Sequence, residues 1–166
     1  AFSQKFDLSK YEKERLSYSK KSMLVLGGWS VVNIVVSGIA TNTRNTEMRY
    51  FHQMNVMWGG INLDIAGLGY WGASREKINN PLLADVLKQQ GRTERTYLIN
   101  AGLDVVYAGA GLWMNKTSAY QKKPDMFKGY GNSIMLQGGF LLIYDAIIYA
   151  IHKNHGRQLK GLTDKV

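Results

Sequence analysis

Apolar residues along the chain are gathered into four stretches of about twenty residues each. The stretches cover 22–41, 53–74, 97–115 and 132–152, and every Lys and Arg lies outside them. A helix needs about 20 residues to cross the ~30 Å hydrocarbon core of a bilayer, and helices pair their own backbone groups inside lipid. The pattern therefore predicts an all-α fold, a polytopic membrane protein with four transmembrane helices in an antiparallel bundle.

The second and third stretches are less apolar than the other two. Both are rich in glycine, each carries one Asp, and neither contains Lys, Arg or Glu. Glycine in a soluble helix costs about 1 kcal/mol relative to alanine, whereas small residues let helices approach closely in a membrane bundle. This composition favours membrane helices that face other helices. A soluble, glycine-rich four-helix bundle is the alternative.

Two polar segments have amphipathic character. Residues 7–21 carry Leu and Tyr among charged residues, which predicts a helix on the membrane surface. In the loop after the second stretch, Asn80 and Pro81 predict a helix start and Gly91 its end. We therefore expect interfacial helices at the N-terminus and in this loop. The predicted organisation is a basic segment over 1–21, the bundle over 22–152 and a basic tail over 153–166.

The charge distribution predicts an orientation. The 166-residue chain has a net charge of +9. Fifteen Lys and Arg lie in the N-terminal segment, the second loop and the tail, against six in the other two loops. By the positive-inside rule both termini are cytoplasmic in a multi-pass protein, which we assign to a bacterial inner membrane. The chain begins at Ala1 without Met, and removal of a signal peptide would instead place the N-terminus outside.

The basic residues also bear on partners. They are scattered over short segments without interleaved aromatic residues, which favours anionic lipid headgroups and argues against nucleic acid. The chain has no cysteine, which excludes a disulfide scaffold and Cys-ligated zinc. In the predicted topology His52 lies on the outer side and both His152 and His155 lie on the inner side, and no His/Glu metal-ligand motif is present, so neither haem nor zinc is expected.

Three carboxylates lie inside the apolar stretches. An ionised Asp at the centre of a membrane helix costs roughly 2.5–3.5 kcal/mol on insertion scales, so three of them call for an explanation. Counted from the predicted cytoplasmic ends, the three lie at similar depth. Amide and phenol side chains share helix faces near them. The candidate ligand- or cation-binding residues are therefore Asp64, Asp104, Asp145, Asn33, Asn62, Asn100 and Tyr107.

Several functions remain open for such an acidic, polar bundle core. It can bind or move a proton, a cation or a small ligand, or its polar groups can simply hold the helices together. No sequence motif indicates an enzyme, and no catalytic residue is assigned. A non-catalytic accessory subunit of a larger membrane complex is the main alternative, and self-association as a dimer is a further expectation. A quinone- or lipid-handling enzyme using His52 or His152 has only position in its favour.

Overall fold

The computed structural model describes residues 6–163 and consists of four long helices without a strand in that range. The helices are α1 (Leu8–Ala40), α2 (Thr46–Arg75), α3 (Leu83–Thr117) and α4 (Pro124–Thr163), and a short 3-10 helix, η1 (Ser118–Tyr120), precedes α4. The prediction of an all-α chain agrees with this architecture, and so does the predicted number of long helices.

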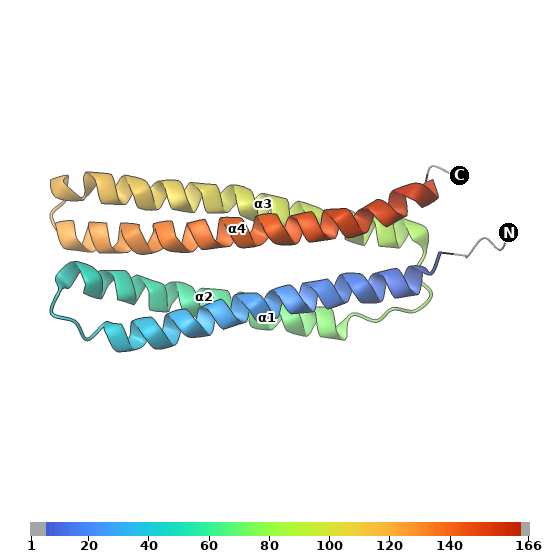
Figure 1. The fold of residues 1–166 in the computed structure, drawn as a ribbon, viewed down its shortest axis with the longest axis horizontal. Helices are drawn as coiled ribbons and strands as arrows, with labels where there is room; N and C mark the ends of the chain where they lie inside the picture. The colour runs from blue at the N-terminus through green and yellow to red at the C-terminus, as the bar shows by residue number, and fades with distance from the viewer. Residues whose placement is uncertain (1–5, 164–166) are drawn as a thin grey trace.

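The four helices lie lengthwise beside one another (Figure 1). The α1–α2 and α3–α4 connections lie at one end, and the α2–α3 connection lies at the other end with both ends of the described chain. α1 packs mainly on α2, and α3 packs on α4. The two pairs meet chiefly through α2 and α4, whereas the backbones of α2 and α3 do not approach each other closely within the described residues.

The distribution of side chains is inverted relative to a water-soluble bundle. Large aliphatic side chains cover the middle of all four helices on the outside; Val32, Leu68, Val106 and Ile143 are 55%, 69%, 63% and 63% exposed. Buried positions are instead largely polar. Two helical segments, Leu8–Ala40 and Pro124–Leu162, are long and apolar enough to cross a membrane. α2 and α3 are less apolar because polar residues occupy their inward faces.

The N-terminal segment is not a separate surface helix, which corrects the prediction for residues 7–21. Asp7 caps α1, with Oδ1 accepting from the backbone N–H groups of Ser9 and Lys10 at 3.0 Å. No Gly or Pro follows until Gly27, so the helix continues unbroken into the apolar stretch. Its apolar residues face other helices, because Tyr11 is 2% and Leu16 6% exposed.

The loop helix predicted between Pro81 and Gly91 is likewise not separate. Asn80 adopts a left-handed conformation with φ of 42°, so α3 begins after it, at Leu83, and Gly91 lies inside α3. The tail is helical too, as part of α4 up to Thr163. The apolar face of each segment packs on the other segments: Tyr11, Val86 and Leu159 form one buried cluster.

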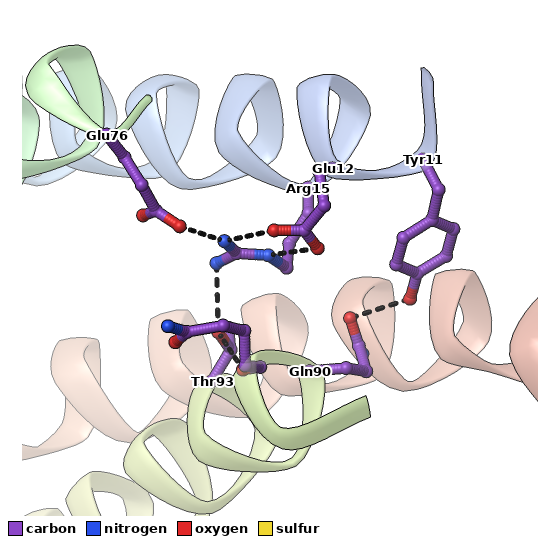
Figure 2. A network of polar contacts seen from close by, with 7 residues as sticks. Tyr11, Glu12, Arg15, Glu76, Gln90 and Thr93 are labelled. Carbon is purple, nitrogen blue, oxygen red and sulfur yellow. Dashed lines mark hydrogen bonds and ion pairs between the residues drawn. The ribbon is translucent and has the colours of Figure 1, made fainter. Parts of the chain in front are cut away.

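These three segments form what we call the polar end: Asp7 with residues 8–21 of α1, residues 83–96 of α3 and residues 152–163 of α4. Figure 2 shows Arg15 at its centre, with Nε and Nη2 on the two carboxylate oxygens of Glu12 at 3.0 and 2.8 Å. Nη2 also reaches Glu76 at 2.7 Å, just beyond α2. Burial alone lowers the pKa of Arg15, but the hydrogen bonds and charges of Glu12 and Glu76 outweigh it and raise that pKa.

Candidate functional site

A cavity of about 330 Å³ lies between all four helices. Five of the seven candidate residues line it, namely Asn62, Asn100, Asp104, Tyr107 and Asp145. The rest of the wall is aromatic or aliphatic. It consists of Met23, Leu26, Trp58, Ile61, Ile65, Tyr97, Leu103, Leu141 and Tyr144.

Two buried carboxyl groups meet in this cavity. Asp104 of α3 is 3% exposed and Asp145 of α4 is 5% exposed. The two carboxyl groups lie close enough to interact with each other, and the Asn100 side chain lies beside Asp145. Two ionised carboxylates repel strongly at such a separation. A shared proton or a bound positive charge would remove this repulsion.

Close packing of α3 and α4 brings the two carboxyl groups together. Gly138, about two turns before Asp145, lies directly against the α3 backbone, and a methyl group on it would come within 3.0 Å of Asp104 O and 2.7 Å of Ala108 N. Gly111 and Gly131 meet in the same way further along the two helices. Only glycine permits this approach, so these three positions set the α3–α4 distance at the carboxyl pair.

Three buried polar atoms at the cavity have no hydrogen-bond partner among the described residues. They are Trp58 Nε1, Asn62 Nδ2 and Asp104 Oδ2. Buried polar atoms are nearly always paired, and an unpaired one costs about 1–3 kcal/mol. The residues that line the cavity thus carry two N–H donors and one carboxylate acceptor without a hydrogen-bond partner among the described residues.

The cavity opens sideways through the apolar outer surface. Its rim residues Ile61 and Ile65 on α2 are 45% and 51% exposed, and Leu103 on α3 is 46% exposed. The backbones of α2 and α3 do not approach each other closely in the part of the chain that the structure describes, and the edge-to-face contact of Trp58 with Tyr107 bridges them. The exposed rim between these two helices is therefore the side from which a guest would approach the carboxyl pair.

Asn33 does not belong to the cavity, which corrects its place in the predicted acidic core. Its Oδ1 accepts a hydrogen bond from Gln137 Nε2 at 2.8 Å, and its Nδ2 donates to Trp29 O at 2.8 Å. Gln137 also donates to Asn55 Oδ1 at 3.0 Å and accepts from Trp29 Nε1 at 3.0 Å. This cluster joins α1, α2 and α4 with its side chains paired, so it holds the helices together.

Asp64 does not lie in the core either. It is exposed on the outer surface of α2, because the buried face of that helix carries Asn55, Gly59, Asn62 and Ala66 instead. Its neighbours Leu63, Ile65 and Leu68 are exposed aliphatic residues. Its carboxylate makes no hydrogen bond or ion pair with another described residue. The predicted layer of three carboxylates is therefore a pair.

The histidines lie apart from the carboxyl pair. His152 is fully buried, and neither ring nitrogen has a partner among the described residues. Its ring stacks on Tyr97, a cavity residue, with centroids 5.5 Å apart. His52 lies near the opposite end and contacts Ser37 Oγ through Nδ1 at 3.1 Å. Within the described residues, no group of three or more His, Cys, Asp or Glu is placed to hold a metal ion.

Tyr97 and Tyr144 line the site but were not among the predicted residues. Tyr97 Oη lies 3.1 Å from Ser22 Oγ, and Tyr144 Oη donates to Ser22 O at 2.8 Å. A signal for Tyr97 exists in the sequence, since it precedes Asn100 by three positions and so extends the face of Asn100, Asp104 and Tyr107. Tyr144 has no comparable signal, because Gly138, Asp145 and Tyr149 already share a face.

Comparison with known proteins adds one finding. A protein-family model described as "Family of unknown function (DUF6992)" matches residues 25–146, which include most of the apolar part and the whole cavity except Met23. No curated protein and no solved structure matches the chain.

Proposed function

Because the chain belongs to the DUF6992 family, whose description states no activity, we propose a function from its geometry. The protein is a four-helix integral membrane protein, and the carboxyl pair of Asp104 and Asp145 binds a proton, a cation or a small cationic ligand inside the bilayer. The observation that carries the proposal is that this buried pair lies at a cavity with three unpaired polar atoms.

The membrane assignment rests on the inverted side-chain distribution. An exposed aliphatic surface over the middle of four helices is unfavourable in water and favourable in lipid. α1 has 33 residues, which makes it about 50 Å long at ~1.5 Å per residue, well beyond the ~30 Å of hydrocarbon. The polar end accounts for the excess length, and we place it in water.

The boundary between lipid and water lies next to the polar end. Arg75 stacks over Trp71 at 4.6 Å, and Lys153 lies over Tyr149 at 5.3 Å. Aromatic residues with adjacent cations are typical of the headgroup level. Since fifteen of the basic residues lie on this side, the polar end and both termini face the cytoplasm, and anionic headgroups are their natural lipid partners.

The test uses conservative removal of charge. Asp104→Asn, Asp145→Asn and the double variant keep side-chain size, and Asp64→Asn is the matched control because Asp64 is exposed and outside the cavity. In nanodiscs, the infrared absorption of a buried protonated carboxylic acid, or a small mass retained in native mass spectrometry, is expected in the wild type and in Asp64→Asn. Both signals should vanish in the double variant. Their persistence there contradicts the proposal.

The exposed position of Asp64 favours a second candidate function, in which the protein is a subunit of a larger membrane complex. A carboxylate among lipid-facing aliphatic residues is costly unless a partner satisfies it. None of the four predicted apolar stretches contains Lys or Arg, so the partner is expected to be another polypeptide with a basic or donor group within the membrane. Native mass spectrometry after gentle extraction tests this: co-purifying polypeptides should be lost in Asp64→Asn and retained in Asp104→Asn.

A further inference from the structure

We propose that the cavity binds the head of a membrane-borne amine: a protonated amine with a hydroxyl oxygen on the neighbouring carbon and one apolar chain. This inference rests on the proposed function of the same cavity and specifies its ligand. It follows from the carboxyl pair, the two unpaired N–H donors, the aromatic wall and the lateral opening.

The carboxyl pair favours a ligand that is positively charged and donates a hydrogen bond. Asp104 Oδ2 has no partner, and an ammonium N–H can donate to it while reducing the repulsion between the two carboxylates. A bare metal ion fits less well. Metal ions in proteins take several oxygen ligands, but the other unpaired atoms of the lining residues, Trp58 Nε1 and Asn62 Nδ2, are N–H donors, which a metal ion cannot satisfy.

Those two donors require an oxygen on the ligand. Trp58 and Asn62 both belong to α2, four residues apart and hence on one face of the helix. The carboxyl pair belongs to α3 and α4. A ligand whose nitrogen and oxygen are on neighbouring carbons can satisfy both sides of the cavity together, which a simple alkylamine cannot.

The aromatic residues of the wall suit a cation. Trp58 and Tyr107 meet edge to face with ring centroids 5.3 Å apart, and Tyr97 and Tyr144 are also part of the lining. Aromatic faces attract ammonium groups by about 0.5–2 kcal/mol, most strongly where water is excluded. A neutral alcohol gains nothing comparable from them.

Size and opening define the rest of the ligand. Pockets that enclose drug-sized molecules run to roughly 300–1,000 Å³, so about 330 Å³ holds a compact head and little more. The rim residues Ile61, Ile65 and Leu103 are aliphatic and face outward. An apolar chain attached to the head can leave between α2 and α3 and remain in the lipid.

The experiment measures binding to the full chain in nanodiscs, corrected for partition into empty discs. Three probes are compared. 2-(Dodecylamino)ethanol carries both an amine and a hydroxyl group, dodecylamine carries the amine only, and dodecanol carries the hydroxyl only. We expect the amino alcohol to bind the wild type about tenfold more tightly than either other probe, as two good polar interactions allow. Asp104→Asn with Asp145→Asn should abolish this preference, and Asp64→Asn should keep it.

Trp58→Phe separates the ligand's two groups. It removes the N–H donor but keeps an aromatic ring, so binding of the amino alcohol should weaken about fivefold while binding of dodecylamine stays unchanged. Equal binding of all three probes to the wild type overturns the inference. If the infrared signal of the carboxyl pair then persists, the proposed function stands and only the ligand class is wrong. If neither that signal nor a retained small mass is found in the wild type, both are wrong.

Discussion

Tyr11 and Gln90, 79 positions apart in the chain, are joined by a 2.7 Å hydrogen bond from the phenol Oη to the amide Oε1 (Figure 2). Gln90 then donates through Nε2 to His152 O at 2.6 Å. The two bonds connect α1, α3 and α4 beyond the apolar surface. The polar end is therefore one packed unit, and its stability can be tested separately from the cavity.

Tyr11→Phe should destabilise the protein and change its response to alkali. Burial, with Glu12 adding to it, raises the pKa of Tyr11 above its usual value. The folded state thus favours the neutral phenol, and this stabilisation is complete below about pH 10, the unfolded pKa of tyrosine, and is lost as pH rises further. Between about pH 9 and 11, the wild type should lose more unfolding free energy than Tyr11→Phe. At neutral pH the variant should be about 1 kcal/mol less stable.

The measurement is chemical unfolding in mixed micelles, followed by circular dichroism across that pH range. Tyr120→Phe is the control, because Tyr120 is 88% exposed. A parallel pH dependence in the wild type and Tyr11→Phe contradicts the prediction.

Arg15→Met should cost about 3 kcal/mol of unfolding free energy, since it strands a buried carboxylate. The Arg15 and Glu12 side chains are each 5% exposed, whereas the second partner, Glu76, is 37% exposed and can turn to water. Adding Glu12→Gln should recover more than half of the loss, because no buried charge is then left alone. The same unfolding assay measures both variants, with exposed Lys13→Met as the control. An additive double variant would falsify the assignment of a coupled pair.

Gly138→Ala should destabilise the chain by about 1–3 kcal/mol, the usual cost of overpacking. The added methyl group meets the α3 backbone at Ala108 N, and backbone cannot move aside as a side chain can. Gly139→Ala is the matched control, since its methyl group would have nothing within 4 Å, and it should be neutral or slightly stabilising. Thermal unfolding of the two variants in one detergent compares them. Equal midpoints contradict the close α3–α4 approach.

Gln137→Leu should weaken the junction of α1, α2 and α4 without changing the carboxyl pair. The change leaves Trp29 Nε1 and Asn33 Oδ1 without their partner, at a cost of about 2 kcal/mol. Thermal unfolding should show this loss, while the infrared signal of the buried acid stays. Leu136→Ala, at a 43% exposed neighbouring position, is the control. Loss of the infrared signal in Gln137→Leu would mean that the polar cluster around Gln137 and the carboxyl pair depend on each other.

Helix number was predictable from the sequence, because apolar runs bounded by basic residues leave few alternatives. Which polar residues meet was less predictable. α2 presents two plausible inward faces, one with Gly60, Asp64 and Gly67 and another with Asn55, Gly59, Asn62 and Ala66. Periodicity does not choose between them. The packing does, since Gly59 lies against α1 close to Ile34 and Ser30, and Asp64 is then turned outward.

The amphipathic segments show a different limit of prediction from the sequence. Residues 7–21 and 81–91 have the apolar faces expected of surface helices, and amphipathicity alone does not say what covers such a face. In the structure they cover each other and the end of α4. The absence of Gly or Pro between Leu8 and Leu26 was the local signal that the first segment continues into the bundle.

The proposed membrane placement implies that the four helices differ in how readily each enters a bilayer during synthesis. α1 and α4 each contain a segment long and apolar enough to cross a membrane, whereas α2 and α3 would expose Asn62 and Asp104 to lipid until their neighbours arrive. α1 leaves the ribosome before α2, so we expect these two to insert as a hairpin. We expect α3 to insert stably only with α4, the last of the four helices. Under this proposal, completion of α4 is the step that both stabilises the inserted chain and assembles the carboxyl pair.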